Sequence, residues 1–277
     1  MRTIIHLSDL HFGRTDGEII QPLIDTVTRL APHLVVVSGD LTQRARAKEF
    51  QAARRFLDAL PQPQIVVPGN HDVPLYDVYS RFVRPLEKYR RYISTNVEPT
   101  YVDEEIAVVG VNTARSLTFK DGRINDAQIA DIGTRLCAIN DHVVKIIVTH
   151  HPFDLPAHYH EDELVGRAPL AMKTLADCGA DLLLAGHLHT SHAGNTDARY
   201  GIADYAALVV QAGTATSTRG RGETNSFNVI RASAACITIE RHGWMPESKM
   251  FALTKTETFE SISSADASRK PRWTLRK

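Results

Sequence analysis

Residues 64–72 read QIVVPGNHD, an apolar run followed by a proline, a glycine and a polar cluster. The run Gln64–Val67 has the length and β-branched content of a strand that is buried on both faces. Similar runs occur at Thr3–Leu7, Leu34–Val37, Ile106–Val111, Lys145–Val148 and Asp181–Leu184. We therefore predict a set of buried strands, most of which end in polar residues.

The segments between the early strands have helical periodicity. Ile19–Leu30 and Ala45–Leu60 each place apolar residues on one face of a helix. This alternation of strand and helix indicates an α/β architecture with partly parallel sheets. After position 205 the pattern changes, and no helix is predicted between the apolar runs. The runs Leu208–Ala212, Phe227–Ala232 and Cys236–Arg241 predict antiparallel strands that complete a second sheet.

A third helical stretch, from Leu75 to Ile93, is rich in aromatic residues. They recur at about helical spacing: Tyr76, Tyr79, Phe82, Tyr89 and Tyr92. We expect this aromatic face to pack on the body of the protein. The alternative is a lid whose exposed rings stack on a base or sugar.

Length and composition favour one globular domain over residues 1–255, with the segment 74–98 as a candidate lid. The chain has 277 residues, of which 43% are hydrophobic and 23% charged. We expect residues 256–277 to form a C-terminal tail that is disordered or loosely packed. Lys+Arg and Asp+Glu both total 32, and this neutral charge argues against a nucleic-acid polymer as partner. The late strands could pair between subunits, which leaves a homo-oligomer open.

The sequence suggests a cytoplasmic protein. No basic segment and apolar stretch precede the first strand, so no signal peptide is predicted. No apolar run approaches the ~18–20 residues that span a bilayer. The three cysteines, Cys137, Cys178 and Cys236, are far apart and lack CxxC spacing. We expect them to be reduced and mostly buried thiols.

Five polar clusters follow predicted strands. They are Asp9-Leu10-His11, Gly39-Asp40, Gly69-Asn70-His71-Asp72, His150-His151-Pro152 and Gly186-His187-Leu188-His189. The carboxyl ends of strands in open α/β sheets form the edge where ligands bind. We therefore expect the clusters to converge, with glycines where the backbone passes close to the site.

The clusters combine carboxylate, imidazole and amide groups, a nitrogen and oxygen set that suits Mn, Fe, Zn or Co. Seven such groups are too many for one tetrahedral ion and about right for two ions that share a carboxylate. Two metals roughly 3.5–4 Å apart can clamp a phosphoryl group and generate hydroxide at neutral pH. The sequence thus predicts two divalent or trivalent transition-metal ions as cofactors.

The order DxH, GD, GNHD, H and GHxH resembles that of the calcineurin-like metallophosphoesterase superfamily, over roughly residues 3 to 215. The compact size and the early DxHFG are similar to bacterial class III cyclic-nucleotide phosphodiesterases and glycerophosphodiesterases. The resemblance implies a four-layer α-β-β-α sandwich with two mixed sheets. It also places a dinuclear metal site at the C-terminal edge of the strands.

The resemblance implies a role for each motif residue. One metal would be held by Asp9, His11, Asp40 and His189. The other would be held by Asp40, Asn70, His150 and His187, with Asp40 as the bridge. His71 would stand beside the metals, as proton donor to the leaving alkoxide or hydrogen-bond donor to a phosphoryl oxygen, with Asp72 orienting it. The family pattern selects His150 over the adjacent His151, which could touch substrate or support a ligand.

The predicted activity is hydrolysis of a small phosphodiester by a metal-bound hydroxide, with His71 assisting the leaving group. Cyclic nucleotides and glycerophosphodiesters are the leading substrates, because a diester leaving group depends most on a proton donor. A phosphomonoesterase or a DNA nuclease on the same site is the alternative. A non-catalytic scaffold on this fold is a third reading, although such scaffolds would be expected to have lost ligands.

Four further residues are candidate substrate contacts. Arg115 follows a predicted strand and could contact a phosphate. Arg219 and Arg221 lie in the loop TRGRG, which could bind an anion. His192 lies just beyond the GHxH motif. Each of the four could equally be a solvated loop residue.

Overall fold

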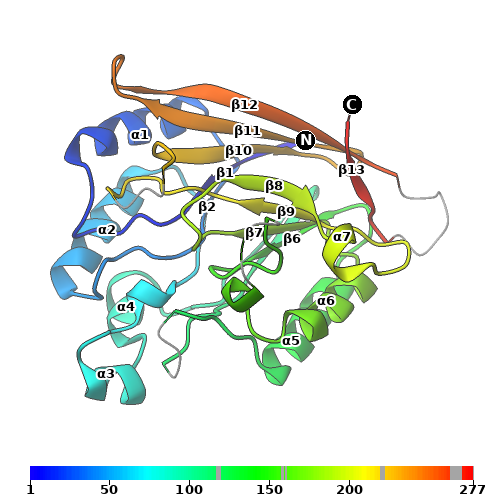
Figure 1. Cartoon of the computed structure of the whole chain (residues 1–277), viewed down its shortest axis with the longest axis horizontal. Helices are drawn as coiled ribbons and strands as arrows, with labels where there is room; N and C mark the ends of the chain where they lie inside the picture. The colour runs from blue at the N-terminus through cyan, green and yellow to red at the C-terminus, as the bar shows by residue number, and fades with distance from the viewer. Residues whose placement is uncertain (117–119, 157–158, 160, 219–221, 263–269, 277) are drawn as a thin grey trace.

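The computed structural model describes residues 1–116, 120–156, 159, 161–218, 222–262 and 270–276. Two β-sheets lie face to face, and helices cover the outer face of each (Figure 1). Within the described residues no helix is long and apolar enough to cross a membrane.

The first sheet has seven strands in the order β13-β12-β11-β10-β1-β2-β3. Their bounds are β1 Arg2–Leu7, β2 Leu34–Val37, β3 Gln64–Val66, β10 Ser226–Ala232, β11 Cys236–Met245, β12 Met250–Ser261 and β13 Trp273–Leu275. Strands β1, β2 and β3 are parallel, whereas β10 to β13 add antiparallel neighbours. The sheet is therefore mixed, and its parallel part comes from the N-terminal strand and helix repeats.

The second sheet has six strands in the order β4-β5-β6-β7-β9-β8. Their bounds are β4 Thr100–Val102, β5 Ile106–Gly110, β6 Val144–Val148, β7 Leu182–Ala185, β8 His192–Asn195 and β9 Leu208–Gln211. The four inner strands are parallel, and β4 and β8 are antiparallel at the edges. Both sheets therefore point several strand ends toward the same side of the molecule.

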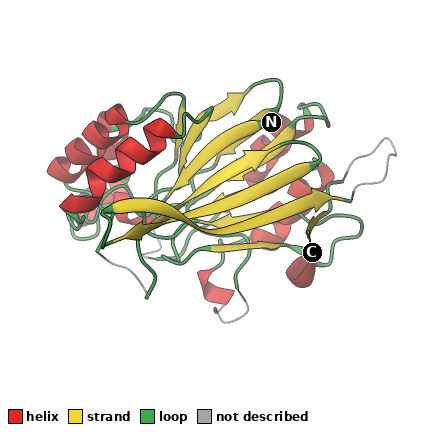
Figure 2. Cartoon of the chain, turned by 90° about the horizontal axis from the view of Figure 1, so that it is seen from above, coloured by secondary structure: helices red, strands yellow, loops and turns green. Residues whose placement is uncertain are grey.

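Alternation of side chains along the strands creates three apolar layers. In β1, Ile4 faces the layer between the sheets and Ile5 faces the helices. Helices α1 (Gly17–Arg29) and α2 (Ala47–Ala59) cover the first sheet, and α5 (Asp126–Cys137) and α6 (Ala168–Asp177) cover the second (Figures 1 and 2). The predicted four-layer sandwich is confirmed.

The predicted third helix is broken in two. Helix α3 (Val78–Val83) ends before Pro85, and α4 (Glu87–Tyr92) begins after it. Proline lacks the N–H of a continuous helix, which explains the break. Tyr89 is buried and donates a hydrogen bond to the carbonyl oxygen of Val66 at 2.8 Å.

The aromatic residues at the start of this segment are exposed. Tyr76 and Tyr79 are 73% and 68% accessible, and Phe82 is also exposed. The guanidinium of Arg44 lies over the Tyr76 ring and donates to its hydroxyl at 2.6 Å. The expectation that the aromatic face packs on the body is therefore wrong for α3, although it holds for Tyr89 in α4.

The expected C-terminal tail is part of the first sheet where the structure describes it. β12 continues through Ser261, and β13 pairs with its end. The Trp273 side chain is fully buried and donates from Nε1 to Asp181 Oδ1 at 3.2 Å. The prediction of a loose tail is wrong for residues 256–261 and 273–275, because Trp273 anchors them. Residues 263–269 and 277 lie outside the described residues.

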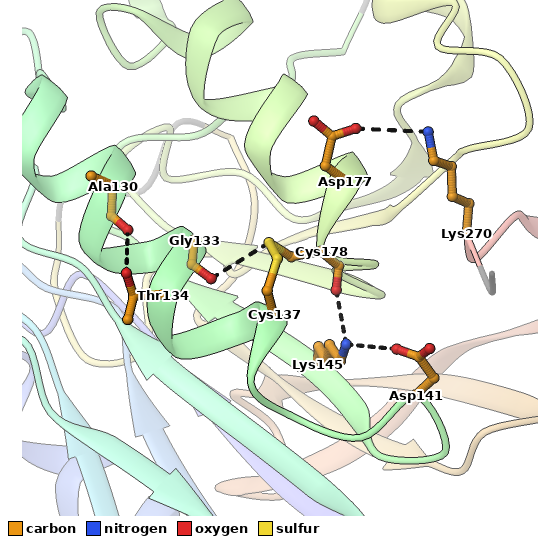
Figure 3. The surroundings of a disulfide bond; sticks show 9 residues. All are labelled: Ala130, Gly133, Thr134, Cys137, Asp141, Lys145, Asp177, Cys178 and Lys270. Carbon is orange, nitrogen blue, oxygen red and sulfur yellow. Dashed lines mark hydrogen bonds and ion pairs between the residues drawn. A yellow bond between two sulfur atoms is a disulfide. The ribbon is translucent and has the colours of Figure 1, made fainter.

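Two of the three cysteines form a disulfide, which corrects the expectation of three reduced thiols. Cys137 ends α5 and Cys178 follows α6, and their Cα atoms are 4.6 Å apart. Figure 3 shows the buried Lys145 beside this bridge, with its ammonium 2.9 Å from the Cys178 carbonyl oxygen. Packing of the two helices brings the cysteines together, which their spacing along the chain does not reveal.

The disulfide gives a stability prediction. Replacing Cys137 by serine is expected to lower the free energy of unfolding by about 3–4 kcal/mol, because the bridge closes a loop of 41 residues in the unfolded chain. Urea unfolding of the variant and the wild type, with and without dithiothreitol, measures this difference. The matched control is Cys236→Ser, since Cys236 is unpaired. Identical wild-type midpoints with and without reductant would contradict the prediction.

Candidate metal centre

The structure brings the five polar clusters together at the carboxyl ends of the inner strands. Five of the seven predicted ligands have left-handed backbone: Asp9 (φ 52°), His11 (48°), Asp40 (52°), His187 (73°) and His189 (59°). Such conformations cost on the order of 1–3 kcal/mol each and are concentrated at functional sites. The sharp turns after β1, β2 and β7 therefore serve to aim these side chains inward.

Glycines allow the turns to approach one another. A Cβ on Gly186 would lie 1.8 Å from Ser8 Oγ and 2.6 Å from Asp9 Oδ2. A Cβ on Gly69 would lie 2.1 Å from Asp40 Oδ1. No larger residue fits at either position without moving a ligand. The predicted close approach of the backbone is thus confirmed for both motifs.

The first group of ligand atoms joins Asp9, His11, Asp40 and His189, which are all buried. The Nε2 atoms of His11 and His189 are 3.1 Å apart. Asp9 Oδ1 lies 3.2 Å from His189 Nε2 and 3.6 Å from His11 Nε2. These atoms surround one point from three turns, those after β1, β2 and β7.

The second group lies on the other side of Asp40. His150 Nε2 is 3.0 Å from Asn70 Oδ1 and 3.4 Å from Asp40 Oδ1. The rings of His150 and His187 are 5.1 Å apart. The other ring nitrogen of His150, Nδ1, donates to the Ser38 carbonyl oxygen at 2.8 Å. That bond fixes the ring so that Nε2 points into the site.

Asp40 connects the two groups through its two oxygens. Oδ2 lies 3.7 Å from His11 Nε2, while Oδ1 faces His150 and accepts the His71 backbone N–H at 2.8 Å. Burial by itself raises the pKa of Asp40, but the charges of His150 and His71 outweigh it, so the pKa is lowered. Asp40 is therefore an ionised carboxylate between two sets of imidazoles.

The residues fit two cations. Asp9 Oδ1 is buried and has no hydrogen-bond partner, although a buried carboxylate oxygen normally has one. Burial by itself raises the pKa of Asp9, but the charge of His189 and the proximity of the His11 ring outweigh it, so the pKa lies well below its usual value. Ionised carboxylates, imidazole nitrogens and an amide oxygen form a donor set for transition metals.

His151 lies close to the second group but is held elsewhere. Its Nδ1 is 2.8 Å from Thr113 Oγ1, and its Nε2 is 2.8 Å from the Lys120 carbonyl oxygen. A carbonyl only accepts, so Nε2 carries the proton and Nδ1 accepts from threonine. Both ring nitrogens are therefore engaged, and His151 is a supporting residue although its ring lies near His187.

His71 stands beside the first group. Its ring packs edge-on against the ring of His11, with centroids 4.9 Å apart. His71 Nδ1 donates to the Gln43 carbonyl oxygen at 2.9 Å. This main-chain carbonyl orients the ring, which corrects the expectation that Asp72 does so.

Asp72 instead braces the turns. Its carboxylate accepts from the backbone N–H groups of Leu41, Thr42 and Gly69 and from the Thr42 hydroxyl. These bonds, between 2.9 and 3.1 Å, tie the turn after β2 to the turn after β3. Asp72 therefore fixes the backbone that carries Asp40 and His71.

The predicted substrate contacts are not gathered at the metal cluster in the described residues. Arg115 donates to the Asn112 and Ala114 carbonyl oxygens at 3.2 Å and contacts Gln128. It lines a cavity of about 570 Å³ between the α3–α4 segment and the loop after β5. His192 is half-buried at the start of β8, opposite Gln211. Arg219 and Arg221 lie outside the described residues.

Sequence reasoning missed several supporting groups. Gln43 acts through its main-chain carbonyl, which no side-chain pattern reveals. Thr113 lies two positions before Arg115, which was the predicted substrate contact of this segment. Glu163 belongs to an acidic run that resembles any solvated loop, and it approaches His187 only in three dimensions. In the sequence, only the motif residues that directly follow predicted strands indicated a role in the site.

Two stacked sheets with helices outside them, and a cluster of carboxylates and imidazoles at the strand ends that could hold two metal ions, are features of a metallophosphoesterase fold. The chain belongs to the calcineurin-like phosphoesterase family, whose model matches residues 2–191. The predicted family membership is confirmed.

Individual proteins agree with this assignment. A glycerophosphodiester phosphodiesterase, GpdQ, from Enterobacter lignolyticus (strain SCF1) is 27% identical over 164 residues, which is 55% of this chain. The chain spans 58% of the length of that protein.

Two solved structures share the fold. The purple acid phosphatase PPD1 from yellow lupin seeds (TM-score 0.66, 11% identity) aligns over 93% of this chain and 53% of its own. A dimetal phosphatase from Danio rerio (TM-score 0.61, 14% identity) aligns over 91% and 98%. At these identities the likeness concerns the fold alone.

Proposed function

We propose that this protein hydrolyses a small phosphodiester, with glycerophosphodiesters and cyclic nucleotides as the leading substrates. The observation that carries the proposal is the placement of His71 beside the seven-residue ligand cluster, with Nδ1 bonded to the Gln43 carbonyl. A site that only binds metal has no use for an oriented imidazole that does not belong to the ligand set.

The ligand set supports Mn, Fe, Zn or Co at both positions. When bound, such ions would neutralise charge on the phosphoryl oxygens and lower the pKa of a bound water. Asp9, His11 and His189 would hold one ion. Asn70, His150 and His187 would hold the other, with Asp40 shared between them. Burial of Asp9 and Asp40 excludes bulk water and strengthens their attraction for cations.

His71 would supply the proton for the leaving group. Since Nδ1–H is committed to a main-chain acceptor, a proton given to substrate would come from Nε2 of the imidazolium form, which leaves a neutral ring with its proton on Nδ1. A diester releases an alkoxide of high basicity, so a positioned proton donor contributes most to this reaction. The similarity to a protein named as a glycerophosphodiester phosphodiesterase supports the same preference.

Paired assays on two chromogenic esters test the proposal. After reconstitution with Mn²⁺, kcat/KM is expected to be higher for bis-p-nitrophenyl phosphate than for p-nitrophenyl phosphate. The Asp40→Ala protein, purified in the same way, measures the background from contaminating phosphatases. Faster turnover of the monoester would favour a phosphomonoesterase. A panel of glycerophosphodiesters, cyclic nucleotides and DNA would then rank natural substrates, and a preference for DNA would favour the nuclease.

A further inference from the structure

Glu163 is the least accessible carboxylate in an otherwise solvated acidic turn. It ends the short 3-10 helix Glu161–Glu163, in which Asp162 is exposed and the Glu161 side chain is 86% accessible. The Glu163 side chain is only 13% accessible. A carboxylate is drawn away from water only where a partner compensates for its lost hydration.

The partner on one side is His187. Glu163 Oε2 lies 3.4 Å from His187 Nε2 and is buried without a hydrogen-bond donor. The only other carboxylate oxygen in the same condition, among the described residues, is Oδ1 of the ligand Asp9. The His187 ring is therefore the nearby polar group that could donate to Glu163 Oε2.

Glu163 approaches His187 from outside the ligand cluster. Potential ligand atoms of His150, His151 and His187 lie within 4.8 Å of one another, and no oxygen of Glu163 belongs to that group. Glu163 therefore lies close to His187 without joining the point where the three histidines converge. An imidazole that binds a metal through one nitrogen usually donates its other N–H to a carboxylate, carbonyl or water.

We propose that Glu163 is the positioning residue of the second metal site, accepting the Nε2–H of His187 so that Nδ1 faces the ion. This inference rests on the dinuclear centre of the proposed function. Such a bond selects one tautomer of His187, restricts rotation of its ring and increases the basicity of the ligating nitrogen. His150 receives the same support from the Ser38 carbonyl, so each imidazole of the second site has its own acceptor.

Lys120 holds Glu163 in place. Its ammonium contacts Glu163 Oε1, which leaves Oε2 directed at His187. The Lys120 carbonyl also accepts the His151 N–H at 2.8 Å. A Cβ on Gly122 would lie 2.2 Å from the His151 ring, so this loop lies tightly against the site. The loop before α5 thereby supports His151 directly and His187 through Glu163.

Metal titration tests the inference without requiring turnover. Apo protein is titrated with Mn²⁺ by calorimetry, and bound metal is counted after dialysis. Glu163→Ala is expected to weaken the binding of one of the two ions about 10–100-fold and to leave the binding of the other unchanged. Glu163→Gln keeps an acceptor oxygen and is expected to lose less. The matched control is Asp162→Ala, which removes the same charge from the same turn and should bind like the wild type.

The thermal midpoint of each apo variant separates positioning from a structural role. The inference would be overturned if Glu163→Ala bound both ions as tightly as the wild type does. It would also be overturned if the variant bound both ions equally weakly and its apo form had a lower thermal midpoint. Its failure is distinguishable from that of the proposed function. A protein that hydrolyses no phosphate ester, yet loses affinity for one ion in Glu163→Ala, would refute the proposed activity and support the positioning role.

Discussion

Replacement of Asp40 by alanine is expected to release both metal ions and to reduce ester hydrolysis to background. The two oxygens of Asp40 face different imidazoles, His11 at 3.7 Å and His150 at 3.4 Å. Loss of this carboxylate removes one ligand and one negative charge from each group at once. Loss of a group that merely supports a ligand costs 10–100-fold in metal affinity, so loss of a shared ligand should cost more than about 100-fold at both positions.

Metal content measured by mass spectrometry after dialysis, and Mn²⁺ titration of the apo protein, check this expectation. Asp154→Ala is the matched control, because Asp154 is a buried carboxylate on the loop after β6 that pairs with Arg199 rather than with the cluster. Asp40→Asn gives an intermediate case, since an amide oxygen still coordinates but carries no charge. Retention of one tightly bound ion in Asp40→Ala would show that Asp40 does not bridge.

The fold of the apo Asp40→Ala protein should survive. Buried carboxylates are kept at functional sites at a cost in stability, so their removal often leaves the apo fold unchanged or more stable. Because Asp40 contacts ligand side chains and the His71 N–H, the packed layers on either side of the sheets do not depend on it. An apo thermal midpoint equal to or above that of the wild type would exclude unfolding as the reason for metal loss.

The local pattern of the sequence was sufficient to predict the buried strands, the α/β architecture and the convergence of the polar clusters, whereas the four-layer sandwich followed from the family resemblance. Continuous β-branched runs predict strands that are buried on both faces, as the neighbours Ile4 and Ile5 show by packing into different layers. Residues at the carboxyl ends of parallel strands share one edge of a sheet, and the stacking of the two sheets brings their edges together. Asp9 follows β1 of the first sheet and His189 follows β7 of the second, and their side-chain atoms are 3.2 Å apart across 180 positions of chain.

Features that depend on packing between distant elements could not be predicted. Cys137 and Cys178 pair because α5 and α6 lie side by side on the second sheet. Trp273 returns to fill the layer between the sheets, which no local periodicity in its own segment indicates. Glu163 stands 24 positions before His187, and its neighbours Glu161 and Asp162 make it look solvated.

His71→Ala is expected to keep both ions and to slow diester hydrolysis about 10²–10⁴-fold, the usual contribution of general acid catalysis. The ring touches His11 at its edge and is fastened by the Gln43 carbonyl, and the hydrogen bond to Asp40 comes from the His71 main chain, which the variant keeps. Metal analysis checks that both ions are retained, and kcat measured for one series of diesters checks the loss of rate. His192→Ala is the control. His192 begins β8 opposite the last residue of β9, and its imidazole does not belong to the ligand cluster.

The dependence on leaving group distinguishes the two roles left open for His71. If Nε2 gives its proton to the departing oxygen, the variant loses most on diesters with basic alkoxide leaving groups and little on p-nitrophenyl esters, whose phenolate departs without help. If Nε2 only donates to a phosphoryl oxygen, the loss should be uniform, because charge on that oxygen develops with every leaving group. Loss of metal in His71→Ala would contradict both roles and make His71 a ligand. Both roles use the same atom, because the Gln43 carbonyl holds Nδ1 as a donor and leaves Nε2 of the imidazolium form as the nitrogen that can serve the substrate, so the leaving-group series decides between them.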